Sequence, residues 1–272
     1  MKKYIRLFVS LLFAICLNAG ITHAQNSIVK KNIKLEKVTY TSGSTNLIGY
    51  VAYDSLKKGK RPAVVVVPEW WGNNDYAKTR AKMLAELGYI AIAADMYGDG
   101  KVATDPTKAQ EYATPFYQDP QLGKDRIEAA VDKLKEYTQT DSDKMAAIGY
   151  CFGGAMVLNA AKMGSELKGV VSFHGGLNGV EATDSSMTTK ILVCHGSADK
   201  SVSDADVKKF KNNLDSLGVP YTFIVYPGAT HAFTNPAATG VGKKFKMPIK
   251  YNAVADKKSW NDMRVFLKKI FK

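Results

Sequence analysis

The sequence predicts an α/β fold in which a mainly parallel central sheet is flanked by helices on both faces. Short apolar runs rich in β-branched residues recur along the chain, as is typical of strands buried on both faces. Segments with helical spacing separate these runs, which is the pattern of strands joined by helical crossovers. The chain has 272 residues, of which 46% are hydrophobic, so it can bury a sizeable core.

The N-terminal part of this sheet is predicted to be an antiparallel pair of strands. Apolar and polar residues alternate over residues 34–52 around a turn at residues 42–44. We expect this pair to form one edge of the sheet. A buried strand follows at residues 63–67 and stops at Pro68.

The alternation of strand and helix then continues to the C-terminus. Further strands are expected at residues 89–94, 145–149, 169–173, 191–194 and 221–226, and helices at residues 75–87, 122–137, 154–163, 204–217 and 255–271. Residues 98–121, with three prolines, interrupt the regularity and predict a partly helical excursion over one end of the sheet. Ligands bind at the carboxyl ends of strands in such sheets, so this excursion is either a lid or an ordinary surface crossover.

The first residues have the pattern of a secretory signal. A basic start at residues 2–6 precedes an apolar run at residues 7–17, and residues 22–24 end in a small-residue cleavage pattern. We therefore expect residues 1–24 to be a cleaved signal peptide and residues 25–272 to form a single domain in the periplasm or outside the cell. No stretch approaches the roughly 20 apolar residues of a membrane span, so no stable span is expected.

The basic residues are numerous but scattered. There are 38 lysines and arginines against 25 acidic residues, which gives a formal net charge of +13. They do not form the arginine- and aromatic-rich clusters of a nucleic-acid reader, so no nucleic-acid partner is predicted. The histidines are not paired at metal-ligand spacing, and no phosphate loop or dinucleotide fingerprint is present. The sequence therefore predicts neither a metal nor a cofactor.

The segment Gly149-Tyr150-Cys151-Phe152-Gly153 carries the clearest chemical signal. It lies at the end of a predicted strand and directly before a helix, which is the nucleophile-elbow pattern G-x-S-x-G with cysteine in place of serine. The turn is so tight that side chains at either glycine would collide with backbone. The N-terminus of the helix favours a thiolate. Taken alone the match is weak, because buried cysteines in glycine-rich turns are common.

Two later segments supply partners that could activate this thiol. Asp199 follows the predicted strand at residues 191–194, and His231 follows the one at residues 221–226. Each comes directly after its strand, so both side chains are expected to meet Cys151 at one end of the sheet. The order Cys, Asp, His is that of an α/β-hydrolase triad. A lone aspartate after a strand is usually a turn or cap residue, but three matches in order favour a catalytic triad.

Other residues complete the predicted site. The backbone N–H groups of Trp70 and Phe152 would hold a developing oxyanion. Trp71 and Tyr97 either wall an apolar substrate pocket or are buried as core aromatics. His174, at the end of a strand on the same side as the triad, either lines this pocket or is a structural, hydrogen-bonded histidine.

The sequence resembles the dienelactone hydrolase family of the α/β-hydrolase fold from about Leu35 to the C-terminus. The resemblance is carried by residues 68–72, 149–154, 195–199 and 228–233. It implies a carboxylic ester hydrolase that takes a small-molecule ester or lactone and needs no cofactor. In that family the glutamate matching Glu69 interacts with the nucleophilic cysteine and takes part in its activation; the alternative for Glu69 is a structural salt bridge.

The sequence departs from the family's namesake at the two arginines that hold the carboxylate of dienelactone. The matching positions here are Asp99, or its neighbour Gly98, and Asn235. An anionic lactone would lose its bidentate clamps, so dienelactone itself is not the expected substrate.

Together these features predict a secreted hydrolase in which Cys151 attacks an ester, lactone or thioester carbonyl. His231 would shuttle the proton, Asp199 would orient the imidazole, and water would resolve the acyl-enzyme. Two alternatives remain: a non-catalytic ligand-binding protein on the same fold, and a thiol peptidase or acyltransferase. The sequence leaves the natural substrate and the oligomeric state open.

Overall fold

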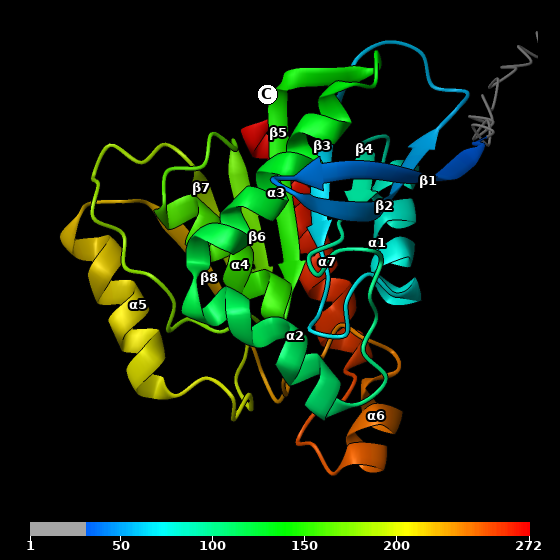
Figure 1. The fold of residues 1–272 in the computed structure, drawn as a ribbon. Coiled ribbons are helices and arrows are strands. Elements are labelled where there is room, and N and C mark those ends of the chain that lie inside the picture. Colours follow the sequence, from blue (N-terminus) through cyan, green and yellow to red (C-terminus); the bar gives the residue numbers. More distant parts are fainter. Residues whose placement is uncertain (1–30) are drawn as a thin grey trace, which may run out of the picture. The chain divides into compact units, whose positions relative to one another are not determined.

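The central sheet has eight strands, most of them parallel, in the computed structural model, which describes residues 31–272 (Figure 1). The strands are β1 (Ile33–Ser42), β2 (Thr45–Asp54), β3 (Arg61–Val67), β4 (Ile90–Ala93), β5 (Thr140–Tyr150), β6 (Gly169–Phe173), β7 (Lys190–Gly196) and β8 (Tyr221–Tyr226). Their order in the sheet is β1-β2-β4-β3-β5-β6-β7-β8. The predicted signal peptide, residues 1–24, lies outside the described residues and stays a prediction.

The sheet combines an antiparallel edge with a parallel centre. β1 pairs antiparallel with β2, and β2 pairs antiparallel with β4, while the remaining neighbours are parallel. Every residue of β4 and β6 is buried, which explains why these strands are continuous apolar runs rather than alternating ones. The predicted fold class and the antiparallel edge are therefore confirmed.

Helices cover both faces of the sheet. The helices are α1 (Asp75–Glu86), α2 (Pro106–Gln118), α3 (Pro120–Lys135), α4 (Phe152–Lys162), α5 (Asp204–Ser216), α6 (Ala238–Phe245) and α7 (Ala253–Ile270). Buried residues of α3, α4 and α5 pack on one face, and those of α1 and α7 pack on the other. Among residues 31–272, no helix is both long and apolar enough to cross a membrane.

The excursion between β4 and β5 is partly helical, as predicted. It contains α2, which is drawn at the lower end of Figure 1 with α6. α3 begins at Pro120, earlier than the sequence pattern indicated, because the Asp119 side chain accepts the backbone N–H of Gln121 and proline suits the first helical position. α6 was not predicted. Both α2 and α6 lie toward the end of the sheet at which β5 leads into α4.

Candidate active site

Cys151 sits on a strained turn between β5 and α4. Its backbone has φ +53° and ψ −113°, a conformation that side-chain-bearing residues rarely adopt. A Cβ added at Gly149 would lie 2.0 Å from the carbonyl oxygen of Gly153, and one added at Gly153 would lie 2.3 Å from that of Val67. Both flanking positions therefore need glycine, as predicted for a nucleophile elbow.

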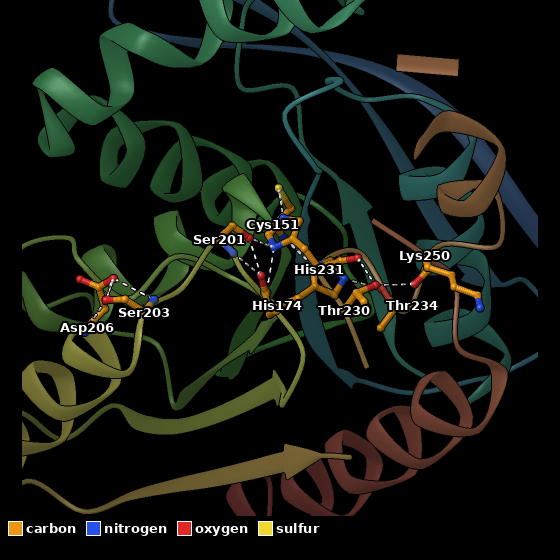
Figure 2. A network of polar contacts seen from close by, with 10 residues as sticks. Cys151, His174, Ser201, Ser203, Asp206, Thr230, His231, Thr234 and Lys250 are labelled. Atoms are coloured by element: carbon orange, nitrogen blue, oxygen red, sulfur yellow. Dashed lines mark hydrogen bonds and ion pairs between the residues drawn. The ribbon is translucent and has the colours of Figure 1, made fainter. Parts of the chain in front are cut away.

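The loops after β7 and β8 bring Asp199 and His231 to this turn. Figure 2 shows His231 next to Cys151. His231 Nε2 lies 2.9 Å from Cys151 Sγ, and His231 Nδ1 lies 2.9 Å from Asp199 Oδ2. The contact with Asp199 holds the ring proton on Nδ1, so the Nε2 lone pair faces the sulfur. Cys151 and Cys194 are both free thiols, and Cys194 is fully buried in the core.

The surroundings shift the pKa values of His231 and Asp199 in opposite directions. Burial opposes protonation of His231, but the Cys151 sulfur and the hydrogen bond to Asp199 outweigh it and raise the pKa of His231 well above 6.5. Burial also opposes ionisation of Asp199, yet His231 and Ser201 lower the pKa of that carboxyl to about 2. The imidazole of His231 can therefore hold an additional proton while the Asp199 carboxylate stays ionised.

Ser201 is a site residue that sequence reasoning missed. Its backbone N–H donates to Asp199 Oδ1 at 2.9 Å, and its hydroxyl makes a short hydrogen bond to the same oxygen. The hydroxyl also lies 2.8 Å from His231 Nδ1. The available signal was the spacing Asp-x-Ser, in which an aspartate commonly accepts a hydrogen bond from the backbone two residues later.

Glu69 lies in the same cavity wall as Cys151 and His231 and has a neutral partner. The side chain is 3% exposed and lines the same cavity as Cys151. Its Oε2 accepts a hydrogen bond of 2.7 Å from the Asn235 amide, where the resemblance placed an arginine. Burial raises the pKa of Glu69 to about 7, against the opposing effect of Asn235. Asp99, at the other arginine position, pairs at the surface with Lys101.

A backbone hydrogen bond connects the two segments that carry the predicted oxyanion donors, Trp70 and Phe152. Phe152 is the first residue of α4, so its N–H has no acceptor within the helix. The N–H of the next residue, Gly153, donates to the carbonyl of Pro68 at 3.0 Å, which fixes the loop bearing Trp70 against the elbow. Trp70 and Phe152 both line the cavity.

Tyr97 and His174 lie behind the cavity wall rather than in it, so they do not have the predicted lining position. The hydroxyl of Tyr97 donates to the carbonyl of Trp70 at 3.0 Å, and its ring packs against Phe152. His174 is 1% exposed; its Nδ1 accepts the N–H of Cys151 at 3.1 Å, and its Nε2 lies 2.7 Å from the Thr234 hydroxyl. For His174 the structural alternative holds.

The cavity next to Cys151 has a volume of about 640 Å³. Trp71 lines it and stacks on Phe245 of α6 with ring centroids 6.1 Å apart; its part in substrate binding stays a prediction. Gln110 and Tyr117 of α2 also contribute to the wall, so the excursion between β4 and β5 reaches the site. Within residues 31–272, no group of three or more His, Cys, Asp or Glu side chains is arranged to hold a metal ion.

A sheet of this order, with an elbow between β5 and α4 and polar loops after β7 and β8, defines the α/β-hydrolase fold. The family model described as "Dienelactone hydrolase family" matches residues 48–271. The chain therefore belongs to the dienelactone hydrolase family and is a carboxylic ester hydrolase of that family.

Two comparisons illustrate the relationship. A crystal structure described as a dienelactone hydrolase-like promiscuous phosphotriesterase from metagenomic libraries is 37% identical, with a TM-score of 0.83, over 88% of this chain and 99% of that chain. A protein of Bradyrhizobium sp named "Probable 2-oxo-3-(5-oxofuran-2-ylidene)propanoate lactonase" is 25% identical over 250 residues, which are 88% of this chain and 95% of the relative. Both likenesses extend over nearly the whole length of the relative.

Proposed function

We propose that the protein hydrolyses an ester, lactone or thioester bond through an acyl-enzyme formed on Cys151. The observation that carries this proposal is the pair of 2.9 Å contacts that connect Cys151 Sγ, His231 and Asp199 in series. The signal-peptide pattern of residues 1–24 supports a periplasmic or extracellular location, which belongs to the same proposal.

In the first half of the reaction, the Cys151 sulfur attacks the carbonyl carbon after its proton has passed to His231 Nε2. The carbonyl oxygen becomes negative and is stabilised by the N–H groups of Trp70 and Phe152. The tetrahedral intermediate then collapses, the bond to the leaving group breaks, and His231 returns the proton to the departing oxygen or sulfur. An acyl thioester on Cys151 remains.

In the second half, water replaces the leaving group. His231 takes a proton from the water as its oxygen attacks the thioester, and Asp199 stabilises the resulting imidazolium. Collapse of this second intermediate releases the carboxylic acid and regenerates the thiol. We assign Glu69 to the activation of Cys151, on the basis of the family resemblance and its place in the same cavity wall.

The proposal is tested by replacing Cys151 with alanine and measuring the hydrolysis of p-nitrophenyl butyrate. We expect the activity to fall at least ~1000-fold, because a triad cannot work without its nucleophile. Cys194→Ala is the matched control, since that thiol is buried away from the cavity and should leave turnover intact. An undiminished Cys151→Ala enzyme would contradict the proposal.

Further assays of the wild-type protein separate the alternatives. A non-catalytic binding protein would release no p-nitrophenol above background and would form no acyl adduct detectable by mass spectrometry. A thiol peptidase would turn over the corresponding anilide, and an acyltransferase would be faster with an added alcohol or amine acceptor than with water alone.

A further inference from the structure

The cavity beside Cys151 differs in charge from the rest of the protein. The chain carries 38 lysines and arginines, with a formal net charge of +13. Within the described residues, however, no lysine or arginine lines this cavity. The ionisable groups in its wall are Glu69, Tyr117, Cys151 and His231. The protein as a whole is therefore strongly basic, whereas the wall of this cavity contains no lysine or arginine that would carry a permanent positive charge.

Two buried cations near the cavity are already engaged by other groups. Lys162 donates to the backbone carbonyl of Val180 at 2.7 Å, and Arg80 is bound on the other side of the site. Arg80 is 4% exposed, and its Nη2 donates at 2.6 Å both to the carbonyl of Thr234 and to the carboxylate of Asp256. Its guanidinium thus ties α1 to α7 and to the loop after His231 and does not line the cavity. A substrate anion could not recruit it without breaking a buried ion pair, which is costly.

The other ionisable groups in the wall provide no fixed positive charge for an anion. Glu69 is held by the neutral amide of Asn235 and not by a cation, and the Cys151 sulfur must become negative to react. A substrate carboxylate in this cavity would be desolvated without an opposite charge, which costs several kcal/mol. His231 offers no lasting compensation, because its proton is needed by the leaving group.

The wall instead offers apolar surface and neutral hydrogen-bonding groups. Trp70 and Trp71 present aromatic rings, and Met247 and Ile249 extend the apolar surface. Asn178 adds a side-chain amide. This is the composition expected around an uncharged ligand that is partly aromatic or aliphatic.

We propose that the cavity selects uncharged esters or lactones with an apolar body and discriminates against analogues that carry a carboxylate. This inference rests on the proposed function, because it names the substrate class of the same site. It concerns the charge of the wall, so it can be tested separately from the chemistry at the sulfur.

The test compares two substrates that differ in one charge: mono-p-nitrophenyl glutarate, an anion, and its methyl ester, which is neutral. We expect kcat/KM for the methyl ester to exceed that for the anion by ~100-fold or more, since the anion is buried unpaired. Equal or faster hydrolysis of the anion would overturn the inference and leave the proposed function intact.

Failure of the proposed function has a different signature. If neither ester is hydrolysed above background, the catalytic proposal is wrong, and the charge preference is then measured by binding. The quenching of tryptophan fluorescence by methyl glutarate and dimethyl glutarate reports that preference directly. Tighter binding of the dimethyl ester would support the inference, and tighter binding of the anion would overturn it.

Supplying the missing cation sharpens the test. Asn178 lines the cavity and is exposed, so Asn178→Lys places a positive charge at the wall with little effect on the core. We expect the ratio of kcat/KM for the anion to that for the methyl ester to rise at least ~10-fold, a gain of about 1.4 kcal/mol for the anion. Asn261→Lys, exposed on α7 outside the cavity wall, is the matched control for net charge and should leave the ratio unchanged. A ratio that stays constant in Asn178→Lys would count against the inference.

Discussion

Two histidines, His231 and His174, contact Cys151 in different environments (Figure 2). His231 contacts the sulfur, whereas His174 accepts the backbone N–H of the same residue. The two rings meet edge to face with centroids 5.3 Å apart, so they are neighbours in space. Their environments nevertheless give them opposite proton affinities: the pKa of His231 is raised well above 6.5, and that of His174 is lowered well below it.

The difference arises from what each ring faces. Burial is the largest influence on both rings and favours the neutral form. At His231 the Cys151 sulfur and Asp199 overcome burial, whereas His174 has the Thr234 hydroxyl and an N–H donor as partners. Proximity to Cys151 is therefore not enough to raise the pKa of a histidine; His231 also has a carboxylate partner and direct contact with the sulfur.

Removing the cavity-side histidine is expected to have the largest effect. His231→Gln leaves Cys151 without a proton acceptor, so kcat/KM should fall roughly 1000-fold or more. The sulfur should also react more slowly with iodoacetamide at neutral pH, because no imidazole remains at 2.9 Å to take its proton. The pH dependence of inactivation by iodoacetamide measures this change. An unchanged inactivation profile in His231→Gln would show that the two histidines do not differ as described.

Removing the buried histidine should have a smaller and different effect. His174→Phe keeps a ring against Phe233 but removes the second acceptor of the Cys151 N–H, which still bonds to the carbonyl of Phe173 at 3.0 Å. We expect kcat to fall about tenfold, corresponding to about 1.4 kcal/mol, with little change in KM.

The stability of this variant provides a second readout. His174 is neutral when folded, while in the unfolded chain it takes up a proton as the pH falls through about 6.5. The free energy of unfolding of the wild-type protein therefore falls by up to about 1.4 kcal/mol for each pH unit below 6.5 on account of His174. This fall ends at the lowered pKa that His174 has in the folded protein. Urea unfolding at pH 7 and pH 5 should show a smaller loss in His174→Phe. An equal loss in both proteins would mean that His174 is not kept neutral.

The parts of the fold that could be predicted are those specified by local pattern. The continuous apolar runs of β3, β4 and β6 indicate strands buried on both faces, and all three formed. α6 was missed because Gly240 and Gly242 weigh against a helix. The structure explains Gly242: a Cβ there would lie 2.5 Å from the carbonyl oxygen of Ile249, so close packing requires glycine.

In the candidate site, too, some residues could be predicted from sequence motifs and others could not. Cys151, Asp199 and His231 could be predicted because each belongs to a motif with a fixed place after a strand. The contact between Asn235 and Glu69 could not, because it joins residues 166 positions apart through a buried hydrogen bond. Tyr97 and His174 were placed at the right end of the sheet, but the direction of their side chains is decided by tertiary packing.

The smallest expected effect distinguishes two serines that lie close together in sequence. Ser201→Ala removes the hydroxyl that contacts Asp199 and His231 but leaves the backbone N–H on Asp199 Oδ1. A net hydrogen bond contributes about 0.5–1.5 kcal/mol, so kcat/KM should fall about 2- to 10-fold.

Ser203→Ala is the control, because Ser203 caps α5 through a capping box with Asp206 and has no hydrogen bond to Cys151, Asp199 or His231 among the described residues. It should lower the free energy of unfolding by about 1 kcal/mol without changing kcat. Steady-state kinetics and urea unfolding of both variants measure the contrast. If Ser203→Ala lowered kcat/KM as much as Ser201→Ala, the loss would arise from a change in the whole loop after β7. The hydroxyl of Ser201 would then have no separate effect on the position of His231.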